Sequence, residues 1–444
     1  MLFAVVLREQ PDVAVITLLA VTPPGLGARS TPTPSAVPPT ATPASQRAAA
    51  PGATLTTTPP AVLDPAQTQS IANAPPAITS LAPLTFTLSA TASPSPTLAV
   101  SPTATITVTS SPSLSQGWPG NYPELTASKL SVHVVRNEDR LVLELVRRAH
   151  PRLIKALDDF SWLAQVKGVS PGTLTIGRLN DATSDTQEHW PETKDPIAAA
   201  EEYVVAHLDI YQRNPAGDYW EAWNEFVPVT LERWKWYALF EGTRACLMRA
   251  HGLRAAVGGF AAGSPEYSEM ALFVPALEAA HRCGGIFTLH EGVSPIIGCG
   301  VSATDPEVRI PGAPQFDNIP LGYITVRYRY WYEGYLKPRG LGDLPLVVSE
   351  LAVGGIVPES PCNGPGGAGW KGYQSWWVQQ GVGPTGPEAY VNVLAWYDRL
   401  MQKDPYVIGT TIFTAGAISP ELGWTDSDLH DALIPLMNYL LRER

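Results

Sequence analysis

The sequence predicts an α/β protein, a (β/α)8 barrel over residues 117–444 that follows a disordered Ser/Thr/Pro-rich segment. From Leu130 onward, short apolar runs rich in β-branched residues alternate with longer amphipathic runs, which is the pattern of repeated βα units. Eight strand candidates occur, each followed by a helix candidate, and eight such units close one barrel. The length of this part, about 330 residues, fits a barrel with loop insertions.

The predicted elements follow one another in regular alternation. The strand candidates are Leu130–Val135, Leu153–Leu157, Thr173–Gly177, Tyr219–Trp223, Ala255–Gly259, Ile286–Leu289, Leu346–Ser349 and Val407–Phe413. The helix candidates are Leu141–Ala149, Phe160–Val166, Pro196–Gln212, Thr230–His251, Glu269–His281, Tyr323–Leu336, Glu388–Gln402 and Asp428–Arg442. Active sites of such barrels lie at the C-terminal ends of the strands, so polar residues found there are the first functional candidates.

The chain before the barrel has two parts of different composition. Residues 1–21 contain two apolar runs that are too short to span a bilayer, and we interpret them as the remnant of a signal or anchor. Between residues 22 and 116, 50 of 95 residues are Ser, Thr or Pro, and Phe86 is the one aromatic residue. Such a composition cannot bury enough apolar surface to fold, so we expect a disordered stalk.

The formal net charge of −11 belongs to the barrel part alone, because the charges before Gly117 cancel. An acidic domain repels phosphate backbones and anionic membrane surfaces, so we expect no nucleic-acid partner and no membrane insertion by the barrel. A neutral, hydroxyl-rich ligand is compatible with this charge. The four cysteines show no metal-ligand spacing, and we expect neither a metal nor a cofactor.

Polar side chains follow several of the predicted strands. They are His133 after the first strand, Arg178 after the third, Asn224 and Glu225 after the fourth, His290 and Glu291 after the sixth, and Glu350 after the seventh. Long loops rich in Gly and Pro follow the sixth and seventh strands. Trp376 and Trp377 lie in the second of these loops, and Trp424 follows the eighth strand. Aromatic rings at this face favour a platform for a sugar, although packing is the alternative.

Two glutamates stand at the ends of strands that lie across the barrel mouth from each other. Glycosidic bonds are cleaved by two carboxyl groups, which stand about 5–5.5 Å apart in retaining enzymes. Glu225 and Glu350 can therefore converge on one sugar, with the first as acid/base and the second as nucleophile. The alternative is a pair of solvated carboxylates at the strand ends.

The segments around both glutamates resemble a known group of enzymes. Residues 220–225, Trp-Glu-Ala-Trp-Asn-Glu, resemble the strand-four signature of clan A glycoside hydrolases, roughly E-x-W-N-E. Residues 346–350, Leu-Val-Val-Ser-Glu, resemble the strand-seven segment of that clan. The resemblance implies a retaining (β/α)8 barrel with Glu225 as acid/base, Glu350 as nucleophile and Asn224 on the sugar 2-hydroxyl. It also implies a substrate-binding role for His290.

The sequence departs from the clan pattern at four positions. Phe226 replaces the usual Pro, and Ala352 replaces a frequent Gly. Glu291 follows His290 where a Tyr is common nearby, and we consider Glu291 a candidate substrate contact. Phe413 stands near the end of strand eight, where many members carry Trp. The family within the clan is therefore left open.

Further residues complete the predicted site. The catalytic residues are Glu225 and Glu350, and the substrate-binding residues are Asn224, His290, His133, Arg178, Trp424 and Trp376. A packed core histidine is the alternative for His133. We interpret Glu221 as a structural partner of an arginine such as Arg178 rather than as a catalyst.

The cysteines fall into two pairs that the barrel brings near each other. Cys246 and Cys283 lie near the ends of the fourth and fifth predicted helices, which are neighbours in a barrel, and Cys299 and Cys362 lie in the two long loops. We predict disulfides 246–283 and 299–362, which fit an oxidising compartment, with four free thiols as the alternative. We expect an extracellular or cell-surface protein.

The sequence thus predicts a monomeric, retaining glycoside hydrolase that is endo-acting on a plant or microbial polysaccharide, because long aromatic loops suggest an open cleft. The alternatives are an exo-acting β-glycosidase and a non-catalytic carbohydrate-binding barrel. Transglycosylation would use the same residues.

Overall fold

The structure is a computed structural model that describes residues 2–8, 15–21, 124–180, 189–354, 360–365, 367, 369–417 and 423–444. The predicted stalk, residues 22–116, lies outside the described residues. The two apolar runs near the N-terminus pair with each other as antiparallel strands, β1 (Leu2–Arg8) and β2 (Val15–Val21). Within the part of the chain that the structure describes, none of the helices combines the length and the apolar character needed to cross a membrane.

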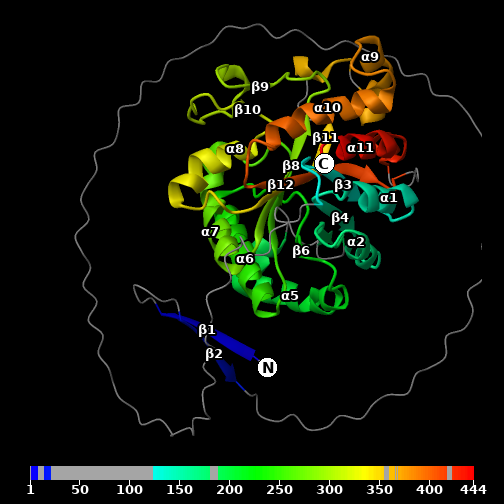
Figure 1. The fold of residues 1–444 in the computed structure, drawn as a ribbon. Helices are drawn as coiled ribbons and strands as arrows, with labels where there is room; N and C mark the ends of the chain where they lie inside the picture. The colour runs from blue at the N-terminus through cyan, green and yellow to red at the C-terminus, as the bar shows by residue number, and fades with distance from the viewer. Residues whose placement is uncertain are drawn as a thin grey trace, which may run out of the picture. The chain divides into compact units, whose positions relative to one another are not determined.

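Eight parallel strands form the centre of the larger unit (Figure 1). They are β3 (Leu130–Val134), β4 (Leu153–Leu157), β5 (Leu174–Arg178), β6 (Tyr219–Trp220), β7 (Ala256–Phe260), β8 (Ile286–Val293), β11 (Leu346–Val353) and β12 (Val407–Ala415). Their order is β6-β5-β4-β3-β12-β11-β8-β7, and a parallel bridge between Trp220 and Ala255 joins the two ends. The predicted (β/α)8 barrel is confirmed.

Helices connect successive strands and cover the outside of the barrel (Figure 1). They are α1 (Arg140–Ala149), α2 (Leu163–Val169), α5 (Pro196–Arg213), α6 (Leu231–Ala250), α7 (Tyr267–Cys283), α8 (Tyr328–Trp331), α10 (Gly386–Met401) and α11 (His430–Arg442). Each overlaps a predicted helix. The sixth begins at Tyr328 instead of Tyr323, because Val326 has a positive φ of 50° that a helix cannot include.

Three strands differ from their predicted bounds in a way that affects the site. The seventh strand, β11, continues to Val353, so Glu350 lies within the strand rather than after it. The sixth strand, β8, continues to Val293, so His290 and Glu291 lie within the strand rather than after it. The fourth strand, β6, ends at Trp220, so Glu225 lies five residues beyond it in an irregular segment. That segment is held by Trp223, whose ring stacks on Phe240 at 4.6 Å between centroids.

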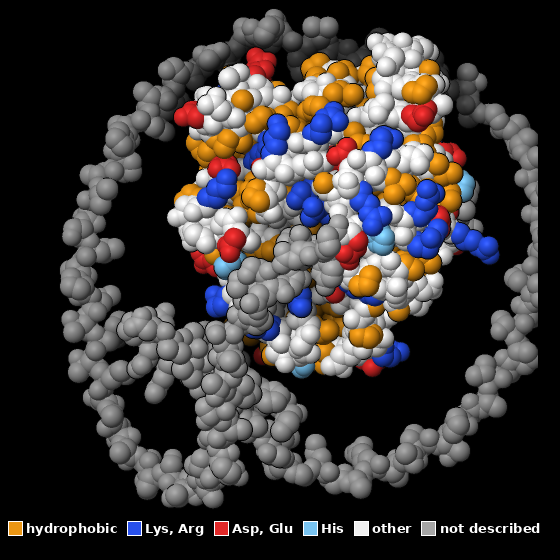
Figure 2. Space-filling model, in the orientation of Figure 1, with side chains coloured by type: hydrophobic (Ala, Val, Ile, Leu, Met, Phe, Trp, Pro, Cys, Tyr) orange, Lys and Arg blue, Asp and Glu red, His pale blue; other side chains and the backbone are white. Residues whose placement is uncertain are grey.

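Apolar side chains fill the barrel and pack its helices. One buried cluster takes residues from seven of the eight strands and therefore lies inside the ring. It comprises Leu153, Leu174, Ile176, Tyr219, Ala256, Ile286, Val347 and Ile408. On the face shown in Figure 2, basic and acidic side chains are both spread over several elements rather than gathered in one patch.

Candidate active site

A cavity of about 500 Å³ lies at the C-terminal ends of the barrel strands. Six of the predicted site residues line it: Arg178, Asn224, Glu225, His290, Glu350 and Trp424. Two further candidates, His133 and Trp376, are not among its lining residues. The cavity is of the size that small-ligand sites usually have.

Glu350 lies on β11 with its side chain 13% exposed, and positively charged groups surround its carboxylate. Arg178 Nη1 is 2.7 Å from Glu350 Oε1, and Lys155 Nζ is 3.0 Å from the same oxygen. Burial alone would raise the pKa of Glu350, but neighbouring groups outweigh burial and hold this pKa well below its ordinary value. The largest of these contributions come from His290, Lys155 and Arg178. Glu350 is therefore a carboxylate at any ordinary pH.

Glu225 differs from Glu350 in both exposure and backbone conformation. Its side chain is 45% exposed, so it is open to the cavity. Its φ is +52°, in the left-handed region that non-glycine residues seldom adopt. The Glu225 N–H donates to Gly259 O at 2.9 Å and so fixes this conformation against the end of β7. Such backbone conformations occur most often at functional sites.

His290 lies between the two glutamates. It is the register partner of Glu350 on the neighbouring strand. Its Nδ1 is 2.8 Å from Glu225 Oε1, and its Nε2 is 3.7 Å from Glu350 Oε1. The contact with Glu225 requires one proton, carried by either the imidazole or the carboxyl group. The structure thus brings both predicted catalytic groups to the same imidazole ring.

Asn224 and Trp424 complete the cavity wall. Arg178 Nη1 donates to Asn224 Oδ1 as well as to Glu350, so one guanidinium positions both side chains. The amide nitrogen of Asn224 remains as a donor. Trp424 is 38% exposed and meets Phe413 edge-on, with centroids 5.3 Å apart. Its position leaves ring surface available to a ligand.

His133 lies next to Glu350 but is fully buried. Its Nδ1 is 2.7 Å from Thr414 Oγ1, and this hydroxyl donates to His133 O at 3.2 Å. Because the hydroxyl proton is used, we assign the imidazole proton to Nδ1. Burial outweighs the Glu350 charge and lowers the pKa of His133 well below its ordinary value, so the ring is neutral. His133 Nε2 is 3.5 Å from Glu350 Oε1, and His133 is not among the residues that line the cavity.

Lys155 is a site residue that the sequence interpretation missed. Its side chain is fully buried on β4, with Nζ 2.8 Å from Glu221 Oε2 and 3.0 Å from Glu350 Oε1. The expected partnership of Glu221 with Arg178 is therefore corrected, since the ion pair that Glu221 forms is with Lys155. Burial opposes ionisation of Glu221, but Lys155 and Arg178 lower its pKa to about 2. A lysine inside the apolar strand Leu153–Leu157 was the available signal, because buried charges need partners.

Glu291 does not have the role that we considered for it. Although this residue lines the cavity, its carboxylate accepts from Tyr397 Oη at 2.6 Å and from the Tyr328 N–H at 2.8 Å. Both contacts come from the helices outside β8, because successive side chains of a strand point to opposite faces. Burial raises the pKa of Glu291 to about 7. Its carboxyl group thus holds α8 and α10 to the barrel rather than a substrate.

The structure contains both predicted disulfides and places Trp376 and Trp377 outside the cavity lining. Both pairings, Cys246–Cys283 and Cys299–Cys362, are confirmed, and they use all four cysteines of the chain. Trp377 is fully buried and donates to Pro295 O at 2.8 Å, so packing explains it. Trp376 is half-buried over Gly364, away from the cavity.

No described group of three or more His, Cys, Asp or Glu side chains is arranged to hold a metal ion.

No protein-family model matches the sequence, and no curated protein matches it. Among solved structures, the chain is similar to the endo-1,4-β-D-mannanase of Thermotoga petrophila, with 13% identity, a TM-score of 0.38, and 71% of this chain and 98% of that chain covered.

Two further solved structures are similar at the same level. A β-galacturonidase of Eisenbergiella tayi matches with 12% identity and a TM-score of 0.39, over 71% of this chain and 50% of that chain. A glucosidase of Croceicoccus marinus matches with 12% identity and a TM-score of 0.37, over 71% of this chain and 68% of that chain. Because all three TM-scores are low, the fold assignment rests on the strand order itself.

Proposed function

We propose that this protein is a retaining glycoside hydrolase that cleaves β-glycosidic bonds, with Glu350 as nucleophile and Glu225 as acid/base. The observation that carries the proposal is that two carboxyl groups, one surrounded by cationic groups and one exposed, reach one cavity. Glu350 is surrounded by cationic groups and ionised, while Glu225 is 45% exposed to the cavity. Both lie against the imidazole of His290, at 2.8 and 3.7 Å.

In the first step, a Glu350 oxygen attacks the anomeric carbon and the bond from that carbon to the leaving oxygen breaks. Glu225 gives its proton to this oxygen, so the departing sugar leaves as a neutral alcohol. The product is a glycosyl ester of Glu350. The ionised state of Glu350 suits this attack, because no proton has to be removed first.

In the second step, water attacks the same carbon and the ester bond to Glu350 breaks. Glu225, now a carboxylate, takes the proton of that water, and both side chains return to their initial states. Asn224, held by Arg178, is suited to donate to the sugar 2-hydroxyl, a contact that strengthens as positive charge develops on the ring. Trp424 supplies apolar ring surface for the sugar.

The test is covalent trapping with a panel of 2-fluoro glycosides, followed by peptide mapping. These reagents slow both steps and let the glycosyl ester accumulate. The expected result is a mass increase of one glycosyl group, located on Glu350, together with net retention of anomeric configuration for the natural substrate. The glycoside that labels fastest identifies the sugar cleaved.

The matched control is Glu350→Gln, which keeps the shape of the side chain and should take no label. Labelling of a different residue, or inversion of configuration, would overturn the assignment of the nucleophile. Binding of glycans by the unmodified protein without turnover of any of them would favour the non-catalytic carbohydrate-binding barrel.

We further propose that the enzyme is endo-acting and works outside the cell. Two disulfides favour an oxidising compartment, since cytosolic thiols are kept reduced. The cavity is bordered by a second, larger hollow at the same end of the barrel, which favours a chain substrate over a small glycoside. An exo-acting enzyme would release single units from one end, and product analysis on a long glycan distinguishes the two.

A further inference from the structure

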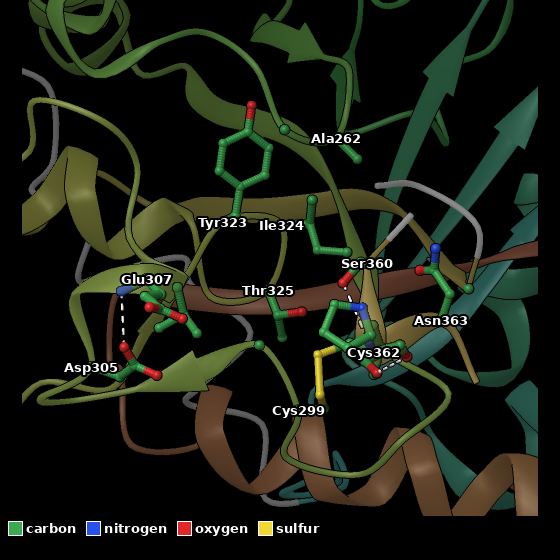
Figure 3. Close-up of a pocket in the computed structure, with 17 residues that line it drawn as sticks. Ala262, Cys299, Asp305, Glu307, Tyr323, Ile324, Thr325, Ser360, Cys362 and Asn363 are labelled. Carbon is green, nitrogen blue, oxygen red and sulfur yellow. Dashed lines mark hydrogen bonds between the residues drawn. A yellow bond between two sulfur atoms is a disulfide. The ribbon is translucent and has the colours of Figure 1, made fainter. Parts of the chain in front are cut away.

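A second cavity, of about 730 Å³, lies beside the first at the same end of the barrel (Figure 3). It is built from the segment after β7 and from the long loops after β8 and β11. Ala262 lines both cavities, so the two are in direct contact. None of the catalytic residues proposed above lines the second cavity, and the reaction leaves it without a role.

The strands that carry the reacting groups also lead to this cavity. Glu350 and Ala352 of β11 line the first cavity, and Gly354 lines the second. His290 lines the first cavity and Ser294, four residues further along, lines the second. Four residues of extended chain span about 13 Å. This length exceeds one sugar ring, so the second cavity suits a neighbouring unit of the same glycan rather than the sugar being cleaved.

The lining of the second cavity combines apolar surface with hydrogen-bond acceptors. Tyr323, Ile324 and the disulfide of Cys299 supply the apolar part, and Figure 3 shows Tyr323 and Ile324 side by side. The hydroxyl groups of Ser294 and Thr325 already donate to backbone carbonyls, at 2.6 Å in each case. Asp305 Oδ1 already accepts from the Glu307 N–H at 2.9 Å, whereas the exposed carboxylate of Glu307 remains to accept from a ligand.

The charge of the lining selects among sugars. No Lys, Arg or His occurs among the described residues that line this cavity, whereas Asp305 and Glu307 do. Carboxylates accept from sugar hydroxyl groups but repel the carboxylates and sulfates of acidic glycans. Acidic sugars are therefore disfavoured here.

Described residues of the two long loops are cross-linked to each other. The disulfide between Cys299 and Cys362 joins the loop after β8 to the loop after β11. Ser294 Oγ donates to Cys362 O across the same junction, and Ser360 Oγ accepts from the Cys362 N–H at 3.2 Å. A cross-link between two walls of the cavity spares part of the entropy of arranging them on binding.

We propose that this cavity is a subsite for a neutral sugar unit of a glycan chain whose cleaved bond lies in the first cavity. The substrate is then a neutral oligo- or polysaccharide that occupies both cavities at once. This inference rests on the proposed glycosidase function for its kinetic test but not for its binding test.

The kinetic test compares an aryl monoglycoside with neutral oligosaccharides of two to six units. For the unmodified enzyme, kcat/KM should rise at least tenfold with chain length. Tyr323→Ala and Glu307→Gln should each remove most of this rise, while activity on the monoglycoside stays within twofold. The matched control is Glu278→Gln on the outer face of α7, where the side chain is exposed and far from both cavities in the fold; it should retain the full rise. Equal losses on all substrates, or no dependence on chain length, would overturn the proposal.

The binding test separates the failure of this proposal from failure of the proposed reaction. Neutral and uronic-acid hexasaccharides are titrated into the Glu350→Gln protein and into the same protein with Tyr323→Ala, by calorimetry. The neutral chain should bind at least tenfold more weakly once Tyr323 is removed, and the uronic-acid chain should bind weakly to both. If neutral binding is unchanged by Tyr323→Ala, or if the uronic-acid chain binds more tightly, the subsite is refuted even in a protein without turnover.

Discussion

Arg178 at the end of β5 and Glu350 on β11 form an ion pair with an N···O distance of 2.7 Å, although their strands stand four places apart in the eight-stranded order. Four places in a ring of eight are opposite sides, so the guanidinium reaches across the barrel mouth. It also holds Asn224. One arginine therefore connects the proposed nucleophile to the proposed 2-hydroxyl contact.

The first prediction concerns the pH dependence of catalysis in Arg178 variants. Positive neighbours depress the pKa of Glu350, so removing one of them by Arg178→Met should raise this pKa. A higher pKa protonates the nucleophile at acidic pH, so the acid limb of kcat/KM should move to higher pH. Arg178→Lys keeps the charge and should move the limb less. An acid limb that stays in place in Arg178→Met would contradict this account.

The second prediction concerns the buried pair of Lys155 and Glu221, whose side chains are 0% and 2% exposed. Lys155→Met removes the ion-pair partner of the buried Glu221 carboxylate, and the unfolding free energy should fall by about 3–5 kcal/mol. Glu221→Gln should cost less, because Lys155 keeps Glu350 as a partner. Urea denaturation at neutral pH measures both.

The double variant Lys155→Met/Glu221→Leu is the informative control for this pair. It removes both charges and replaces them by apolar groups, so it should recover part of the stability lost in Lys155→Met. The matching single variants are Lys155→Met and Glu221→Leu; if the double variant is destabilised by the sum of these two effects, the pair does not act as a unit.

The third prediction concerns Glu291, whose buried carboxyl group has its pKa raised from 4.5 to about 7. Below pH 4.5 the group is protonated in both the folded and the unfolded chain, so it does not lower the free energy of unfolding. As pH rises toward 7 only the unfolded chain loses the proton, so folding stability declines by about 3 kcal/mol at most.

Glu291→Gln resembles the protonated acid and should abolish this decline. The variant should match the unmodified protein near pH 4 and be more stable at pH 8, by thermal unfolding across that range. Its amide can still accept from the Tyr328 N–H, so a loss of stability at both pH values would show that the carboxyl group has a different role.

The fourth prediction concerns the backbone at Glu225, where φ is +52°. Glycine adopts this conformation freely because it has no Cβ, whereas the Cβ of alanine clashes with the backbone there. Glu225→Gly should therefore be more stable than Glu225→Ala by about 1 kcal/mol, and both should be inactive as acid catalysts. At Glu278, within helix α7, the same two substitutions should rank in the opposite order, by about the same amount.

The sequence was sufficient for the architecture because each βα unit carries its own local pattern. The alternation of apolar strand runs with amphipathic helix runs is visible in the sequence without knowledge of tertiary contacts. All eight predicted strands overlap observed ones. The pairing of Cys246 with Cys283 followed from the same topology, since successive helices of a barrel are neighbours. The strand ends also predict that Glu225 and Glu350 converge on one sugar, but their shared contact with His290 is not part of that prediction.

Other features depended on side-chain direction and on contacts between distant residues, which local patterns do not encode. The end of β8 was placed before His290, so the opposite orientations of His290 and Glu291 were not anticipated. The partner of Glu221, Lys155, is 66 positions away on another strand, and the sequence interpretation named an arginine such as Arg178 instead. The second cavity is formed by three loops, whose conformations no periodicity specifies.

Among the described residues, one small residue lines both cavities: Ala262, in the segment after β7. If both cavities hold units of one glycan, as proposed above, an indole or phenyl ring in place of this methyl group would stand between the two proposed sugar sites. The length of the fragments released from a polymer would then be governed by the bulk of one side chain that takes no part in bond breaking. Under the proposed function, product size and bond cleavage would thus depend on different residues.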